Sequence, residues 1–263
     1  MERTPSAARV YDWYLGGANN FEVDREFGNK VLAAMPAVKA IAAANRAFLH
    51  RAVHYLADHG IRQFLDLGSG MPTVGNVHEI AQQIHPEARV VYVDHEPVAC
   101  NYAKDLLRDN EFATVINADV RDAELVLEHK ETRGMLDFDQ PVALLLIAVL
   151  PFIPEDPAPL LARYRQSLAP GSYLAITQSS LDGAPEEFVA QARQSIDSYD
   201  NAGQGVTMRT KAEIASWFDE LDLVPPGVVA PPEWVPDGTS APFTAFGEDP
   251  ARFGGYGALG RIR

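Results

Sequence analysis

The sequence predicts an α/β fold with a mostly parallel, doubly wound sheet that carries helices on both faces. From residue 63 onward, short apolar segments alternate with stretches of helical periodicity. The segment 142–150 is apolar throughout, which is typical of central parallel strands covered on both sides. A glycine turn at Gly68 and Gly70 follows the first apolar segment, where open α/β sheets bind their ligands.

Helices and strands are expected to alternate along the chain. A first helix is expected over 37–58, where apolar residues recur at helical spacing and Gly60 supplies a C-cap. The first five strands are expected at 63–67, 89–93, 113–117, 141–150 and 171–177. The helices between them are expected at 74–84, 97–109, 122–130 and 157–168.

The last third of the chain predicts one more helix and two more strands. Thr210 and Glu213 form a capping box before a helix that ends near Leu221. The strands are expected at 223–229 and 255–262, separated by a proline-rich loop. A parallel sheet would then be completed by an antiparallel pair at its C-terminal edge.

Length and charge favour one domain with a small-molecule ligand. The chain has 263 residues, enough for a substantial core, and no repeat or linker divides it before its last third. We expect a single domain over 1–263, with an N-terminal extension over 1–60 and a sheet core over 61–263. A net charge of −14 would repel a nucleic-acid backbone, and no apolar run is long enough to span a membrane.

Cysteine and histidine usage favours a cytoplasmic protein without a metal. Cys100 is the only cysteine, so neither a disulfide nor a cysteine metal site can form within the chain. The N-terminus lacks the apolar segment of a signal peptide. His50 and His54 share a helix face at ligand spacing, but no third ligand accompanies them.

The glycine turn and the acid after the next strand predict a nucleoside site. Gly68 and Gly70 lack a Cβ, so the backbone can turn tightly and approach a ligand. Asp66, at the end of the first strand, can accept a hydrogen bond from a ligand amine. Asp94 ends the second strand, 24 positions beyond Gly70, where such a unit places a carboxylate against ribose hydroxyls.

A third strand end extends this pattern. Asp119 can accept the exocyclic amine of adenine, while the amide of Val120 meets a ring nitrogen. His95, beside Asp94, can contact the ribose or the adenine edge. Taken singly, Asp94 and Asp119 can equally cap the helices that follow them. The glycines can likewise serve only to form a tight turn, without binding a ligand.

The turn departs from a dinucleotide fingerprint. Thr73 occupies the third glycine position, and Pro72 removes an N–H from the loop that would cradle a pyrophosphate. Acids at three strand ends would repel a pyrophosphate, but they suit an uncharged adenosine that carries a sulfonium. S-adenosyl-L-methionine, which has an amino-acid tail and no phosphate, therefore fits the pattern.

The same residues resemble a known family. The opening segment 5–25 resembles the start of the S-adenosyl methyltransferase family formerly described as a domain of unknown function. The resemblance continues to the C-terminal Gly-Tyr-Gly through segments 45–49, 66–73, 75–79, 92–94, 118–122 and 169–174. It implies a Rossmann-like class I methyltransferase fold with a seven-stranded sheet, and S-adenosylmethionine as cofactor. It supplies no substrate.

Two positions depart from the family pattern. After the fourth strand the resemblance implies Leu-His-Phe, where this chain has Leu150-Pro151-Phe152. After the fifth strand it implies a histidine near Gln178. If either histidine acts as a base in relatives, that role is lost or moved here, and the catalytic residue stays unassigned.

The N-terminal extension is expected to form a helical lid. Its aromatic and polar side chains are unusual for a tail, and Gly16-Gly17 permits a close turn over a ligand. We include Arg25 and Tyr14 among the cofactor-site residues, because Arg25 can pair with a methionyl carboxylate and Tyr14 can orient a substrate. The alternative is that these residues only pin the extension to the body.

Three functions are compatible with these features, in decreasing order of support. The first is an S-adenosylmethionine-dependent methyltransferase that acts on an unidentified small molecule. The second is a non-catalytic protein that binds S-adenosylmethionine or S-adenosylhomocysteine, motivated by the missing histidines. The third is an NAD(P)-dependent oxidoreductase. The sequence indicates neither the methyl acceptor nor the oligomeric state.

Overall fold

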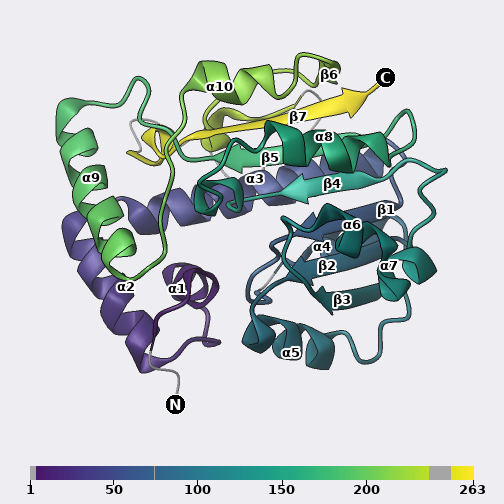
Figure 1. The fold of residues 1–263 in the computed structure, drawn as a ribbon, viewed down its shortest axis with the longest axis horizontal. Helices are drawn as coiled ribbons and strands as arrows, with labels where there is room; N and C mark the ends of the chain where they lie inside the picture. The colour runs from purple at the N-terminus through teal and green to yellow at the C-terminus, as the bar shows by residue number, and fades with distance from the viewer. Residues whose placement is uncertain (1–3, 74, 237–249) are drawn as a thin grey trace.

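The chain forms a seven-stranded sheet, seen in a computed structural model that describes residues 4–73, 75–236 and 250–263 (Figure 1). The strand order is β3-β2-β1-β4-β5-β7-β6. The first five strands run parallel, and β7 runs antiparallel to β5 and β6. This confirms the predicted α/β class. The strands are β1 Gln63–Leu67, β2 Arg89–Asp94, β3 Ala113–Asn117, β4 Ala143–Leu146, β5 Tyr173–Gln178, β6 Leu221–Leu223 and β7 Tyr256–Ile262.

Helices fill the connections and precede the sheet. Capping boxes begin two of them. Thr210 and Glu213 form the predicted one for α10, and Asn76 and Glu79 form a second one for α4 that was not predicted from the sequence. The α-helices are α1 Ala7–Tyr14, α2 Glu22–Ala34, α3 Val38–Asp58, α4 Val77–Ile84, α5 Pro97–Leu106, α6 Ala123–Glu128, α7 Lys130–Met135, α8 Ala158–Gln166, α9 Glu186–Asn201 and α10 Lys211–Ser216. Short 3-10 turns lie at Leu150–Phe152, Pro231–Glu233 and Pro250–Phe253.

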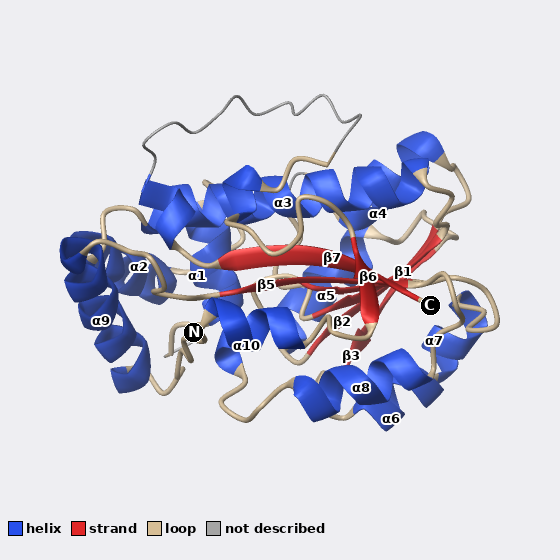
Figure 2. Ribbon diagram, turned by 90° about the horizontal axis from the view of Figure 1, so that it is seen from above, coloured by secondary structure: helices blue, strands red, loops and turns tan. Residues whose placement is uncertain are grey.

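The sheet separates two hydrophobic cores. Leu65 and Leu144 face one side, where α6, α8 and α10 pack against them. Phe64 and Leu145, their neighbours along the strands, face the side covered by α3, α4 and α5. Figure 2 shows α3 and α4 on one face and α8 and α10 on the other. Strand side chains alternate between faces, so covering both faces requires the uninterrupted apolar runs that the sequence contains.

The N-terminal helices lie beyond the carboxyl ends of the parallel strands. Figure 1 shows α1, α2 and α9 grouped past the arrowheads of β3 and β4. Val10 of α1, Val31 of α2 and Ala42 of α3 form a small separate core there. Further along, α3 packs on the sheet through Phe48 and Leu56, so this one helix connects the two regions. No single helix within the described ranges is long and apolar enough to cross a membrane, although α2 and α3, bent by 105°, pass such a test as a pair.

Two expected elements in the middle of the chain differ from the structure. The strand expected over 141–150 is only Ala143–Leu146, because Ala148 has a left-handed backbone with φ of +60° and cannot continue an extended strand. The helix expected over 122–130 is divided into α6 and α7. His129 has an extended backbone between them, and its ring nitrogen caps α7 at Glu131.

The C-terminal third also differs. The helix expected to reach Leu221 ends at Ser216, and Leu221 itself begins β6. β6 ends at Leu223 rather than continuing to Val229, because Pro225 and Pro226 follow and lack backbone donors. The sequence interpretation missed α9 altogether.

Candidate functional site

A cavity of about 800 Å³ lies across the carboxyl ends of β1 to β5. Its walls are the segments that follow these strands, together with α1, α9 and the start of α3. The volume is within the range of small-molecule sites. All the predicted cofactor-site residues except Arg25 line it, namely Asp66, Gly68, Gly70, Asp94, His95, Asp119, Val120 and Tyr14.

The glycine turn has the backbone that its composition predicts. Gly68 and Gly70 have φ of +72° and +67°, which residues with a Cβ rarely adopt. A Cβ on Gly68 would lie 2.5 Å from Val149 Cγ2. The amides of Gly68 and Ser69 donate to the Val93 carbonyl at 2.7 and 3.0 Å. These bonds hold the turn against the end of β2, at the wall of the cavity.

Asp94 organises the loops on both sides of it. Its Oδ2 accepts the Gly70 amide at 2.7 Å, and its Oδ1 accepts the Glu96 amide at 2.8 Å. The residue is 5% exposed. Each carboxylate oxygen has a second lone pair, so both can still accept a hydrogen bond from a diol. The exposed His95 ring lies beside it, with Nδ1 3.8 Å from Oδ1.

Asp119 and Val120 lie at the end of the cavity beyond β3. Arg121 pairs with Asp119 through Nη2–Oδ2 at 2.6 Å and Nε–Oδ1 at 3.0 Å. This guanidinium holds the pKa of the Asp119 carboxyl below its usual range. The Val120 carbonyl accepts a hydrogen bond from the Tyr164 hydroxyl at 2.8 Å. Tyr164 lies on α8, so this helix fixes the backbone of the loop after β3.

Asp66 is a buried carboxyl at the end of β1. Burial raises its pKa to about 7, the nearby Arg46 guanidinium opposes that rise, and Asp94 adds to it. Arg46, on α3, donates from Nη2 to the Gly75 carbonyl at 3.0 Å. Both side chains line the cavity, so its middle carries a cation next to two acids.

A buried ion-pair network attaches α1 to the site. Arg9 of α1 is 3% exposed and donates from Nε to Asp24 Oδ2 of α2 at 2.8 Å. Its Nη1 also pairs with Glu96, which follows β2 and accepts the Ser6 hydroxyl as well. Three segments far apart in sequence therefore meet at one guanidinium.

Further contacts place this segment directly over the glycine turn. A Cβ on Gly70 would lie 3.8 Å from the Ala8 Cβ, so α1 is in van der Waals reach of the turn. Asn19 donates from Nδ2 to the Pro72 carbonyl at 3.2 Å. The N-terminal segment thus covers the part of the cavity that the glycine turn forms.

Arg25 and Tyr14 differ in where the structure places them. Arg25 lies in the first turn of α2 and does not line the cavity. Its Nη1 donates to the Asn20 carbonyl at 3.1 Å and to Asn20 Oδ1 at 3.0 Å, so this nitrogen is engaged by the loop before α2. Tyr14 does line the cavity, with its hydroxyl 3.4 Å from that of Tyr199.

The segment after β4 is held in an unusual conformation. Ala148 lines the cavity with φ of +60°, which costs energy for a residue with a Cβ and is often found at functional sites. Its amide donates to Thr177 Oγ1 at 2.8 Å. β5 therefore fixes the bend that brings Val149 against Gly68.

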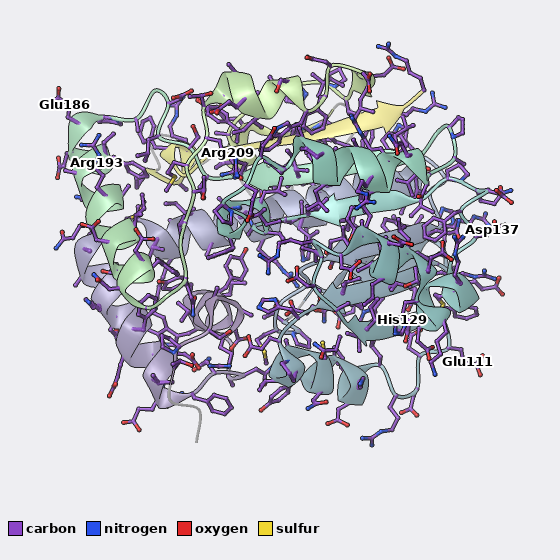
Figure 3. The ribbon with its side chains drawn as sticks, viewed as in Figure 1. Glu111, His129, Asp137, Glu186, Arg193 and Arg209 are labelled. Carbon is purple, nitrogen blue, oxygen red and sulfur yellow. The ribbon has the colours of Figure 1, made fainter. Side chains whose placement is uncertain are left out.

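Gln178, where the resemblance implies a histidine, is fully engaged. It is 2% exposed, and its Nε2 donates to the Thr207 carbonyl at 2.8 Å. Its Oε1 accepts Nη1 of the buried Arg209 at 3.1 Å, and the same Nη1 donates to the Leu150 carbonyl at 3.0 Å. Figure 3 shows Arg209 on the α9 side of the sheet, far from Glu111, His129 and Asp137 at the opposite side.

Sequence reasoning missed three residues of this site. Glu96 follows Asp94 by two positions, and this closeness to a predicted site residue could have identified it. Nothing in the sequence identified Arg46 as a site residue except its place in a segment that carries the family resemblance. Tyr199 lies on the missed α9, where Phe188, Ala192 and Ser195 precede it at helical spacing, so the amphipathic pattern could have revealed it.

Comparison with known proteins establishes the family. A family model described as S-adenosyl methyltransferase matches residues 2–263. The chain belongs to the S-adenosyl methyltransferase family. It is accordingly an S-adenosylmethionine-dependent methyltransferase with a class I fold, as the resemblance implied.

Two crystal structures are similar to this S-adenosyl methyltransferase over nearly their full length. A candidate methyltransferase from Thermobifida fusca YX is 40% identical, with a TM-score of 0.89 over 99% of this chain and 96% of that one. A DUF574 family protein from Streptomyces avermitilis MA-4680 is 36% identical, with a TM-score of 0.90 over 99% and 98%. The S-adenosylmethionine-dependent methyltransferase SibL shares the fold at 17% identity, with a TM-score of 0.53 over 98% of this chain and 64% of that one. No curated protein matches.

The residues present fit S-adenosylmethionine. The left-handed glycines leave the backbone of the turn open where a Cβ would otherwise stand. Asp94 keeps acceptor capacity at the end of β2, and Asp119 lies beyond it at the end of β3. Asp66 and Arg46 lie together in the cavity, which matches an amino-acid tail with one ammonium and one carboxylate.

Proposed function

We propose that this methyltransferase transfers a methyl group to a small molecule held in the same cavity as the cofactor. The observation that carries the proposal is the continuity of this cavity across five strand ends. The part at β1 to β3 would hold the cofactor, which leaves the part at β4 and β5 for an acceptor. The net charge of −14 is unfavourable for a nucleic-acid acceptor.

In this proposal the predicted residues at the ends of β1 to β3 bind the cofactor. Asp94 accepts the ribose hydroxyls, with His95 at its edge, while Asp119 and the Val120 amide hold the adenine. Gly68 and Gly70 let the backbone approach the cofactor.

The amino-acid tail lies over β1 in the same proposal. Asp66 accepts the ammonium group. Arg46, rather than the predicted Arg25, faces the methionyl carboxylate, because Arg46 lines the cavity and Arg25 does not.

In this proposal the protein promotes the reaction by positioning the acceptor and by excluding water from the cavity. The bound cofactor supplies an electrophilic methyl group on a cationic sulfur. The protein needs to hold the acceptor in line with that methyl group and keep water out, which removes much of the entropic barrier. Arg9, Glu96 and Asn19 hold α1 across the turn, so we propose that the N-terminal segment acts as a lid on a single domain.

A second candidate is a protein that binds the cofactor without turning it over. It is favoured by one observation: Pro151 and the fully engaged Gln178 stand where the resemblance implies histidines. Neither side chain can accept a proton at neutral pH. Acceptors that need no base from these two positions are compatible with methyl transfer.

Calorimetric titration and a turnover assay distinguish the two. We expect S-adenosylmethionine and S-adenosylhomocysteine to bind with one site per chain. With methyl-tritiated cofactor, we expect label to appear in an organic-soluble product from at least one pool of a fractionated small-molecule extract. Binding of both nucleosides with no labelled product from any pool would favour the binding protein, and binding of neither would refute both.

A further inference from the structure

The lining of the cavity is divided by charge. Its charged and histidine side chains belong to α1, α3 and the ends of β1 to β3, and they are Arg9, Arg46, Asp66, Asp94, His95, Glu96, Asp119 and Arg121. The remaining part is lined by Tyr14 and by residues of 35–42, 147–153, 177–179 and 192–208, which we call the acceptor chamber. None of its lining residues in the described ranges is charged or a histidine.

Two phenol groups line the acceptor chamber and lie close to each other. The Tyr14 hydroxyl lies 3.4 Å from the Tyr199 hydroxyl, and the two side chains come from helices 185 positions apart in sequence. Phe27 packs edge-on against the Tyr199 ring at 5.0 Å between centroids, and Phe152 lies at 6.3 Å. The Tyr199 ring is therefore packed against two other aromatic rings.

Both phenols stay protonated at neutral pH. Burial raises the pKa of Tyr14 and of Tyr199 above the usual tyrosine value. A protonated phenol has one donor and two lone pairs. Since one hydroxyl can donate to the other, the pair as a whole still offers one donor and spare acceptor capacity to a ligand.

The buried Arg209 side chain has its donors engaged by residues that follow β4 and by the last residue of β5. Arg209 donates to the Leu150, Ile153 and Glu155 carbonyls and to Gln178 Oε1, at 2.7 to 3.1 Å. It does not line the cavity. An ionised ligand in the acceptor chamber would thus lose its hydration without gaining a partner of opposite charge from the described lining, which is unfavourable.

We propose that the methyl acceptor is an uncharged aromatic molecule whose hydroxyl or carbonyl oxygen binds between Tyr14 and Tyr199. The aromatic walls of Tyr14, Tyr199 and Phe152 suit a planar ring, and apolar side chains such as Ile196 and Met208 complete the lining. This inference rests on the proposed methyltransferase function and specifies its substrate class.

Four probes with one ring system test the inference on the full chain saturated with S-adenosylhomocysteine. They are 2-naphthol, naphthalene, 2-naphthoate and 2-naphthylmethylammonium, and their dissociation constants are measured by ligand-observed NMR. We expect 2-naphthol to bind about tenfold or more tightly than either ion, because a charge would be buried without a partner. We expect Tyr14→Phe and Tyr199→Phe each to weaken 2-naphthol about threefold to tenfold and to leave naphthalene unchanged.

The control variant is Tyr102→Phe, which changes a tyrosine that is 42% exposed on α5 and does not line the cavity. It should change no dissociation constant. Equal or tighter binding of an ion, or 2-naphthol binding unaffected by both cavity variants, would overturn the inference. Failure of the wild-type chain to bind S-adenosylhomocysteine would instead refute the proposed function, and that binding is measured first.

Discussion

Asp94 holds two loops of the site through one carboxylate, and we propose that the same carboxylate binds the cofactor. It holds the glycine turn through the Gly70 amide and the following loop through the Glu96 amide. We expect Asp94→Asn to weaken S-adenosylhomocysteine binding by about 2 kcal/mol, or roughly thirtyfold, because hydrogen bonds to a charged acceptor are lost. Calorimetry measures this. The matched control Asp105→Asn, in an exposed pair with Arg108, should leave affinity unchanged, and equal affinities for the two variants would contradict the assignment.

Asp66 should make the stability of the apo protein depend on pH. Its folded pKa is raised to about 7, whereas in an unfolded chain it is about 4. Between these values the folded state binds the extra proton, so the free energy of unfolding falls as pH rises, by at most about 1.4 kcal/mol per pH unit. Above pH 7 this contribution becomes constant. Urea denaturation of wild type and Asp66→Asn between about pH 5 and pH 8 measures the difference, and a difference independent of pH would refute the expectation.

We expect the backbone of the glycine turn to matter more for cofactor binding than that of any other element. Gly70 and Gly60 both have a left-handed φ, +67° and +86°, and a Cβ on either would meet no atom closer than 3.8 Å. Gly70→Ala and Gly60→Ala should therefore each lower the free energy of unfolding by about 1 kcal/mol. Only Gly70→Ala should also weaken S-adenosylhomocysteine binding. If both variants bind equally well, the turn does not approach the cofactor.

Helix α1 provides the test of the lid. Arg9→Gln leaves Asp24, which is fully buried, and Glu96 without their cation, and we expect it to cost about 3 kcal/mol of stability. Hydrogen exchange in α1 should accelerate, and S-adenosylhomocysteine binding should weaken. Arg108→Gln, in an exposed pair, should change stability by less than about 1 kcal/mol. Faster exchange with unchanged affinity would show that α1 only pins the extension to the body.

The bounds of helices and strands were predicted correctly where the apolar pattern and the turn residues indicated the same end point. β1 and β3 have the predicted bounds because an apolar run ends at a turn on both sides. The strand expected over 141–150 was too long, because its apolar residues continue past the bend at Ala148 into the wall of the cavity. An apolar sequence indicates that a segment is buried, but it does not distinguish a strand from a buried loop.

The whole molecule should unfold as one unit, as expected for a single domain. The three tryptophans report on three different cores: Trp13 packs against the N-terminal cluster, Trp217 lies in the core under α8 and α10, and Trp234 lies in the core under α3. Variants that keep one tryptophan and replace the others with phenylalanine should show coincident urea transitions. A separate, earlier transition for Trp13 would show that the N-terminal segment is an independent unit.

Local sequence patterns predicted the order of the seven strands, the glycine turn and the acids at successive strand ends, because these depend on residues close together in the chain. They predict Gly68, Asp94 and Asp119 as members of one cofactor site, since parallel strands bring their carboxyl ends to one edge of the sheet. How the cavity is covered and divided depends instead on contacts between segments that are distant in the chain. Arg9 meets Glu96 across 87 positions, and Tyr14 meets Tyr199 across 185. Local periodicity records that a side chain is buried, but the packing of distant segments decides which partner it meets.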